Sequence, residues 1–297
     1  MPLTARQRKW AIGAVITLGA ALMLNGCADR LFYVPSRAIY AHPREMGLKY
    51  EDVYFSNADG NRLHGFLLMP SGNEQPIATV VHAHGNAANV TNHFPLTLFL
   101  VENGYQVFCF DYRGYGQSQG RITRKGAQSD VKAAIDYVKS RDDVDPQRLL
   151  LFGQSLGGAM TIVEAANRDD IRGIVIESTF TSYYAIARSV MLRSIILAPL
   201  APVLPYLLLS PGLHPIDYVD ELRAPVLFIH GTADNVIPCR MSPELFDKAP
   251  KPKELILIDG MNHLEGLRMP LREYRAPILD FFQRCLEDEF NKENTPD

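Results

Sequence analysis

The stretch that decides the fold is Gly153-Gln154-Ser155-Leu156-Gly157-Gly158, which joins a strand-like apolar run (Arg148–Phe152) to a helical run (Ala159–Asn167). A Gly-x-Ser-x-Gly pattern between a strand and a helix predicts a sharp bend with the serine at its tip. Glycine is favoured beside the serine because a side chain there would collide with neighbouring backbone. We therefore expect the Ser155 hydroxyl to project beyond the strand, above the positive end of a helix, as a candidate nucleophile.

Short β-rich runs alternate with helix-length stretches along most of the chain. The first two runs, Tyr50–Ser56 and Arg62–Met69, are separated by an Asp-Gly turn signal, which predicts a hairpin. Amphipathic stretches such as Gly126–Ser140 separate the later ones. The later β-rich runs are Ala78–Ala83, Gln106–Phe110, Arg148–Phe152, Ile171–Ile176, Pro225–His230 and Glu254–Ile258. This order predicts an α/β fold over residues 46–290, with a mostly parallel twisted sheet, helices on both faces and an antiparallel N-terminal edge.

Two loops at the ends of later strands supply an acid and a base for Ser155. Ligands of such sheets bind beyond the carboxyl ends of the strands. Asp234 follows the run Pro225–His230, and His263 follows Glu254–Ile258, so the chain order is serine, acid, histidine. We expect His263 to take the proton from Ser155 and Asp234 to hold its imidazole ring.

Two other carboxylates compete with Asp234 for this role. Glu177 ends the run Ile171–Ile176, but we expect it to be a buried group that braces the neighbouring loops. Asp259 is a weaker rival because it lies too near His263 along the chain.

An oxyanion formed on attack by Ser155 needs backbone donors. One is the N–H of Leu156, directly after the nucleophile. The second is expected from the loop His84-Gly85-Asn86-Ala87-Ala88-Asn89, where Gly85 allows close approach and Asn86 is the candidate donor through its N–H. The alternative is that Gly85 and Asn86 merely form a turn.

These motifs resemble those of the α/β-hydrolase superfamily, over about Tyr50 to Leu286. Within it, the chain is similar to a membrane-associated branch of serine hydrolases that includes eukaryotic protein depalmitoylases, which act on palmitate thioesters. The shared stretches are His84-Gly85-Asn86, Asp111-Tyr112-Arg113-Gly114-Tyr115-Gly116 with Ser118 and Gly120, Ser155-Leu156-Gly157-Gly158, Glu177-Ser178-Thr179-Phe180-Thr181-Ser182, and His230-Gly231 leading to Asp234. The eukaryotic depalmitoylases carry a multi-cysteine leader that this chain lacks, so their substrate does not follow.

The resemblance implies a serine esterase or thioesterase that needs no cofactor and takes a small-molecule or lipid-like acyl ester. A peptidase or amidase of the same fold is the alternative, and a non-catalytic envelope lipoprotein is a further one. Arg113 is expected to be structural rather than substrate-binding.

The N-terminus resembles a bacterial lipoprotein signal. Three basic residues precede an uncharged run of 15 residues (Trp10–Leu24), and Leu24-Asn25-Gly26-Cys27 follows. The run fits a signal peptide over residues 1–26 and is short for a membrane span. Cys27 is therefore the expected lipidation site, and Ala28 after it mildly favours the outer membrane. A plain signal peptide and an uncleaved anchor helix are the alternatives.

Three further segments are expected around the α/β domain. Residues 27–45 form a linker, 291–297 a flexible tail, and 181–215 a cap insertion with an apolar, proline-broken stretch from Ile195 to Leu209. Two interpretations of the cap are open: an apolar wall for an acyl chain or a face resting on lipid, and ordinary packing of a cap core.

Composition excludes some functions. The net charge is −3 and no basic tract occurs, which argues against nucleic-acid binding. The eight histidines are scattered and no Cys-x-x-Cys pair occurs, so we expect no metal site. Cys109 lies in an apolar run and is expected to be a core residue.

Overall fold

The computed structural model describes residues 27–72 and 75–292. The chain divides into two compact units. Among the described residues, the smaller unit consists of Cys27–Phe32 and Tyr183–Gly212, and the larger consists of Tyr33–Ser182 and the chain from Leu213 onward. The expected signal peptide, residues 1–26, lies outside the described residues.

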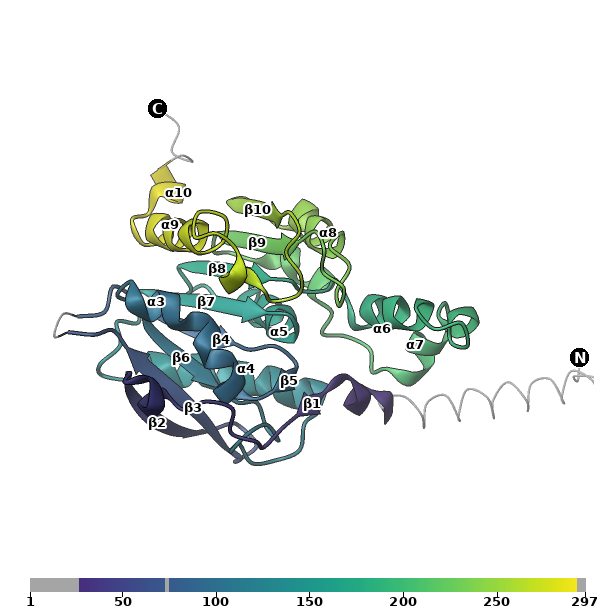
Figure 1. The fold of residues 1–297 in the computed structure, drawn as a ribbon, viewed down its shortest axis with the longest axis horizontal. Helices are drawn as coiled ribbons and strands as arrows, with labels where there is room; N and C mark the ends of the chain where they lie inside the picture. Colours follow the sequence, from purple (N-terminus) through teal and green to yellow (C-terminus); the bar gives the residue numbers. More distant parts are fainter. Residues whose placement is uncertain (1–26, 73–74, 293–297) are drawn as a thin grey trace, which may run out of the picture. The chain divides into compact units, whose positions relative to one another are not determined.

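An eight-stranded sheet forms the centre of the larger unit, in the order β10-β9-β8-β7-β4-β6-β3-β2 (Figure 1). Its strands are β2 (Lys49–Ser56), β3 (Arg62–Met69), β4 (Thr79–Ala83), β6 (Gln106–Phe110), β7 (Leu149–Gln154), β8 (Gly173–Glu177), β9 (Val226–Gly231) and β10 (Lys253–Ile258). β2 pairs antiparallel with β3 and β3 with β6, whereas all other neighbours are parallel. The predicted fold class, a mostly parallel sheet with an antiparallel N-terminal edge, is confirmed.

Helices cover both faces of this sheet. They are α2 (Val90–His93), α3 (Leu98–Glu102), α4 (Arg124–Lys139), α5 (Leu156–Ala165), α8 (Met241–Lys248), α9 (Arg275–Leu286) and α10 (Glu289–Lys292). Short 3₁₀ turns are η2 (Pro43–Met46), η3 (Phe94–Thr97), η5 (Pro215–Asp217), η6 (Val219–Glu221) and η7 (Gly266–Arg268). A two-stranded parallel pair, β1 (Val34–Pro35) and β5 (Ala87–Ala88), stands apart from the main sheet.

Alternating side chains of β6 show how the two faces are filled. Val107 and Cys109 join one apolar cluster with residues of α3 and α9, whereas Phe108 packs on Tyr137 of α4 with ring centroids 5.7 Å apart. Cys109 is fully buried, and burial raises the pKa of its thiol to about 12, so it is a core residue as expected.

Some element bounds differ from the sequence prediction. The helix after Ser155 begins at once, at Leu156, rather than at Ala159, so the bend contains no spacer. α4 begins at Arg124 because the Thr123 hydroxyl accepts a hydrogen bond from the N–H of Gly126 (3.1 Å) and caps the helix. α10 includes residues 291 and 292, which were expected to belong to the flexible tail.

The smaller unit contains η1 (Cys27–Phe32), α6 (Tyr183–Leu192), η4 (Ala198–Leu200) and α7 (Leu204–Leu208). The carboxylate of Asp29 accepts a hydrogen bond from the N–H of Ser210 (3.1 Å), and the rings of Phe32 and Tyr183 meet edge to face. Within residues 27–72 and 75–292, no helix combines the length and apolar character that crossing a bilayer requires.

Candidate active site

The bend at Ser155 joins β7 directly to α5. Ser155 has φ 53° and ψ −116°, a conformation that a non-glycine residue rarely adopts. Its backbone is held on both sides: its N–H donates to the carbonyl of Glu177 (2.8 Å), and its carbonyl accepts from the Thr179 hydroxyl (2.7 Å). Backbone strain of this kind persists only where the surrounding structure enforces it, and it is concentrated at functional sites.

The glycines beside Ser155 are needed for close packing. A Cβ atom at Gly157 would lie 2.0 Å from the carbonyl oxygen of Ala83, and one at Gly153 would lie 2.6 Å from Thr161 Oγ1. Both distances are far below van der Waals contact. The steric reason that the sequence gives for these two glycines is therefore confirmed.

The structure brings Ser155, His263 and Asp234 together from three strand ends. His263 Nε2 lies 3.1 Å from Ser155 Oγ, and His263 Nδ1 lies 2.7 Å from Asp234 Oδ2. Because the carboxylate can only accept, Nδ1 carries the hydrogen and Nε2 is left to accept from the serine hydroxyl. The side chain of Asp234 is buried, whereas that of His263 is 15% exposed.

Several donors hold the Asp234 carboxylate in its charged form. Burial alone would raise its pKa, but hydrogen bonds from His230 and His263 and from the backbone N–H of Ile237 lower the pKa well below its usual range. His230 Nε2 lies 3.2 Å from Asp234 Oδ2, and the N–H groups of Val236 and Ile237 each donate to Oδ1 at 2.8 Å. His230 was not predicted as a partner of this acid, although its spacing of four residues from Asp234 is visible in the sequence.

Asn262 connects the loops that carry the acid and the base. Its side-chain oxygen accepts from the N–H of Asn235 (3.1 Å) and from that of His263 (2.8 Å). This contact was also missed, because an asparagine in a loop carries no signal of its partner.

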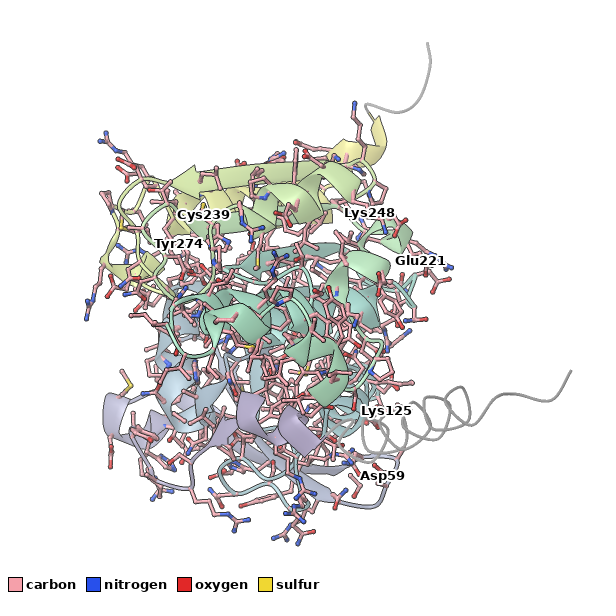
Figure 2. All side chains as sticks on the ribbon, turned by 90° about the vertical axis from the view of Figure 1, so that its right-hand side faces the viewer. Asp59, Lys125, Glu221, Cys239, Lys248 and Tyr274 are labelled. Atoms are coloured by element: carbon pink, nitrogen blue, oxygen red, sulfur yellow. The ribbon has the colours of Figure 1, made fainter. Side chains whose placement is uncertain are left out.

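The two rival carboxylates have other partners. Glu177 Oε2 accepts from Gln154 Nε2 (2.6 Å) and from the Tyr274 hydroxyl (2.7 Å), and its burial raises its pKa. Tyr274 lies directly before α9 (Figure 2), so Glu177 braces the end of β7 against that helix start. Asp259 accepts from the Thr232 hydroxyl (2.9 Å).

Leu156 and Asn86, the expected oxyanion donors, lie on the elbow and on the loop after β4. Leu156 is the first residue of α5, where backbone N–H groups lack a partner within the helix. Gly85 lies close to the nucleophile, because a Cβ placed there would be 3.7 Å from Ser155 Cβ. The side-chain oxygen of Asn86 accepts from the N–H of Val34 (3.1 Å) and from the Tyr115 hydroxyl (2.9 Å), which fixes the residue in place.

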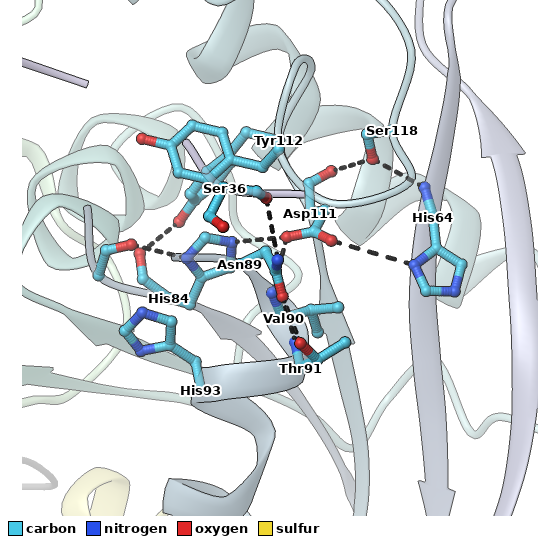
Figure 3. Close-up of polar contacts among 12 residues, drawn as sticks. Ser36, His64, His84, Asn89, Val90, Thr91, His93, Asp111, Tyr112 and Ser118 are labelled. Atoms are coloured by element: carbon cyan, nitrogen blue, oxygen red, sulfur yellow. Dashed lines mark hydrogen bonds and ion pairs between the residues drawn. The ribbon is translucent and has the colours of Figure 1, made fainter. Parts of the chain in front are cut away.

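A buried polar network lies behind this loop (Figure 3). His84 Nδ1 donates to the carbonyl of Gly85 (2.6 Å), and its Nε2 lies 3.3 Å from Asp111 Oδ1. Asp111 also accepts from the N–H of Val90 (2.7 Å), and on its far side His64 Nδ1 lies 4.0 Å from Oδ2. Asp111 was recognised only as part of a shared motif, and nothing in the sequence spacing pairs it with His84.

Arg113 of the same motif has a structural role. It donates to both oxygens of buried Asp130 (2.8 to 3.1 Å) and to Asp59 in the turn between β2 and β3 (Figure 2). It therefore ties α4 to the antiparallel edge, in agreement with the expectation.

No metal-binding cluster of three or more His, Cys, Asp or Glu side chains occurs in the described part of the chain. Cys109, Cys239 and Cys285 are free thiols. The side chain of Cys27 lies outside what the structure describes.

Comparisons with known proteins agree with this architecture. The sequence model of the family described as "Serine aminopeptidase, S33" matches residues 74–217, which include Ser155 and Asn86. The protein YfhR of Escherichia coli K12 is 35% identical over 295 residues, covering 97% of this chain and 99% of YfhR. The α/β-hydrolase domain-containing protein WAV2 of Arabidopsis thaliana is 30% identical and covers 81% of each chain.

A solved structure shows the same fold. The esterase Pf2001 of Pyrococcus furiosus superposes with a TM-score of 0.70 at 21% identity, covering 85% of this chain and 98% of that one. Because the α/β-hydrolase domain-containing protein WAV2 is 30% identical and covers 81% of each chain, the chain belongs to the α/β-hydrolase superfamily. Within that class, YfhR and WAV2 are among the relatives to which it is similar along most of its length.

Proposed function

We propose that this protein is a serine hydrolase that cleaves carboxylic ester or thioester bonds through an acyl-enzyme on Ser155. The observation that carries the proposal is the hydrogen-bonded series from Ser155 Oγ through His263 to Asp234, at 3.1 and 2.7 Å. A serine hydroxyl needs an adjacent base to become a nucleophile, and the base needs an orienting group.

The proposed reaction has two halves. Ser155 Oγ bonds to the carbonyl carbon while its proton passes to His263 Nε2, and the N–H groups of Leu156 and Asn86 stabilise the oxyanion. The bond to the leaving alcohol or thiol then breaks, and that group takes the proton from His263. Water repeats the steps on the acyl-enzyme: His263 takes its proton, the new C–O bond forms, and Ser155 leaves with the proton as the acid is released. No cofactor takes part.

A fluorophosphonate probe tests the nucleophile. We expect the intact protein to be labelled and the Ser155→Ala variant to remain unlabelled. A wild-type protein that resists labelling, or a Ser155→Ala variant that is labelled equally, would refute the serine-hydrolase proposal.

Amide hydrolysis is the second candidate, because the matched family carries the description "Serine aminopeptidase, S33". We place ester cleavage first because esterases such as Pf2001 share the fold across 85% of this chain. A panel of acyl esters, acyl thioesters and amino-acyl amides, graded by chain length, separates the two. A higher kcat/KM on the amides would reverse this order.

We further propose that the protein is a lipoprotein of the bacterial envelope, bound to the outer membrane through an acylated Cys27. The support is the order of basic residues, a 15-residue uncharged run and Leu24-Asn25-Gly26-Cys27. Removal of residues 1–26 would take away three positive charges and no acid, so the mature charge becomes −3 − 3 = −6.

A further inference from the structure

Exposed apolar side chains are concentrated in one short segment of the smaller unit. Nine of the eighteen large apolar side chains that are exposed among the described residues lie between Val190 and Leu207. Ile195 and Ile196 are 95% and 83% exposed. Monomeric proteins rarely gather exposed apolar side chains in one patch unless the patch meets a partner or a membrane. We call the exposed apolar residues between 190 and 207 the apolar face.

The apolar face is distinct from the interior of its own unit. Ile186, Ala201, Pro205 and Leu209 of the same unit are buried. The apolar face is what remains exposed after these apolar side chains have been covered.

The charge of the segment favours a lipid surface. Residues 183–212 contain Arg188 and Arg193 and no acidic residue, although the whole chain is acidic. Apolar side chains flanked by arginines are typical of segments that lie in the interface of anionic bilayers. Tyr206, which is 57% exposed and pairs with the ring of Tyr184, is of the type enriched at headgroup level.

The position of the N-terminal segment in the sequence also favours a membrane contact for the smaller unit. η1 belongs to the same unit, where Asp29 accepts from the N–H of Ser210. Leu24, the end of the uncharged run, precedes Cys27 by three residues, which span at most about 10 Å. Either an embedded leader or an acylated Cys27 would thus hold the smaller unit against the bilayer.

We propose that the apolar face lies in the headgroup region of an anionic membrane as a monotopic contact, in addition to any attachment at the N-terminus. This proposal is independent of the hydrolase function.

Depth-dependent quenching tests it in the full chain. Trp10 is the single tryptophan, so a Trp10→Phe background allows one reporter at a time. We would place the reporter by Ile196→Trp in the apolar face, with Leu257→Trp on β10 in the larger unit as the control, since Leu257 is also an exposed apolar residue. The vesicles contain phosphatidylglycerol and phosphatidylcholine, with and without brominated acyl chains.

We expect brominated lipid to quench the Ile196→Trp reporter at least twofold more than the Leu257→Trp reporter. Quenching of the Ile196→Trp reporter by aqueous acrylamide alone would mean that the face points to solvent and would overturn the proposal. Protection from both quenchers would mean that protein covers the face, which would also overturn it. Equal quenching in pure phosphatidylcholine would overturn the preference for anionic lipid.

The network behind Gly85 carries a second, independent inference. In a trans peptide the C=O and N–H groups point in opposite directions, so the hydrogen bond from His84 Nδ1 to the Gly85 carbonyl (2.6 Å) also sets the direction of the Asn86 N–H. That N–H is the second oxyanion donor of the proposed mechanism.

His84 is itself held from three sides. Its Nε2 faces Asp111 Oδ1 at 3.3 Å, its carbonyl accepts from the Tyr112 hydroxyl (2.7 Å), and its ring stacks on that of His93. His84 and Asp111 are both fully buried, so the contact between them is shielded from bulk solvent. Figure 3 shows Asp111 between His84 and His64.

We infer that His84 is a positioning residue, held by Asp111, which orients the Gly85–Asn86 peptide for oxyanion binding. This inference rests on the proposed function. Loss of one oxyanion donor lowers kcat by about 10²-fold or more in enzymes of this chemistry, with little effect on substrate binding.

The Asp111→Asn variant tests the inference, with Asp130→Asn as the matched control. Both carboxylates are fully buried, but Asp130 pairs with Arg113, away from the loop. We expect Asp111→Asn to lower kcat at least tenfold with KM within twofold, and to weaken an alkylboronic acid, which mimics the tetrahedral intermediate, by a similar factor. Asp130→Asn should lower thermal stability without changing either quantity in the folded fraction.

Equal effects of the two variants on kcat and boronate affinity would overturn the positioning role. Failure of the positioning role can be told apart from failure of the proposed function. An inactive wild-type protein that resists fluorophosphonate would refute the proposed function itself.

Discussion

His263 stands between an acceptor and a donor, and this fixes its tautomer. Asp234 Oδ2 receives Nδ1–H at 2.7 Å, and the serine hydroxyl lies 3.1 Å from Nε2. An amide in place of the carboxylate could donate to Nδ1 and stabilise the opposite tautomer. We expect Asp234→Asn to lower kcat by about 10⁴-fold, measured on a short-chain p-nitrophenyl ester.

The rival acid provides the control for that measurement. Asp259 bonds to Thr232, so Asp259→Asn should retain near wild-type kcat. A comparable loss of kcat in both variants would mean that any change in these two loops lowers activity, and that the charge of Asp234 has no special role.

His64 makes part of the stability dependent on pH. Burial alone would lower its pKa, but the carboxylates of Asp111, 4.0 Å from Nδ1, and of Asp52, hydrogen-bonded to Nε2 at 2.7 Å, raise the pKa above 6.5. A raised folded-state pKa contributes stability that is complete below pH 6.5 and is lost as pH rises through the folded-state value. The free energy of unfolding of wild type should therefore exceed that of Asp52→Asn most at pH 5.5–6.5 and less at about pH 9. Chemical denaturation at each pH measures the difference, and a gap that widens with pH contradicts the assignment.

At the scale of elements, the elbow depends on close backbone contact between β7, α5 and β4. A methyl group at Gly157 would meet the Ala83 carbonyl at 2.0 Å, and backbone at this site cannot give way. We expect Gly157→Ala to lower the free energy of unfolding by about 3 kcal/mol or to prevent folding, as overpacking does. Gly60→Ala is the control: Gly60 has a positive φ but nothing within 4 Å, so about 1 kcal/mol is expected. Thermal unfolding measures the melting temperature of both variants. Equal falls in melting temperature would argue against a steric collision at Gly157.

Elements were predictable from the sequence where a single local pattern determined them. Buried parallel strands such as β7 contain continuous apolar runs, and the glycines at 153 and 157 predicted the bend. Contacts between distant loops had no such pattern. The pairing of His84 with Asp111 joins residues 27 positions apart whose partners are set by the fold, and the bracing of Glu177 by Tyr274 spans 97 positions. The sequence therefore allowed the loop residues of the site to be predicted, but not their hydrogen-bond partners.

At the scale of the whole molecule, attachment to the membrane is open to a direct test. If Cys27 is acylated, Cys27→Ser should remove the thiol that accepts the lipid, and the precursor should retain residues 1–26. We expect at least a tenfold fall in the lipid-labelled, outer-membrane fraction, measured by radiolabelled palmitate and fractionation. If the Cys27→Ser protein stays attached to the membrane without the palmitate label, the result would point to an uncleaved anchor helix. Cys239→Ser is the control because that thiol lies in the larger unit.

The left-handed backbone at Ser155 has a consequence for how such a protein could change over generations. An L-residue held at φ 53° stores conformational energy that glycine would not, so a Ser155→Gly protein should melt at a higher temperature than a Ser155→Ala protein. At this one position, the residue that catalysis requires is therefore not the residue that gives the highest stability. Relatives that are no longer selected for hydrolysis would be expected to acquire glycine there, and to gain stability as they lose activity.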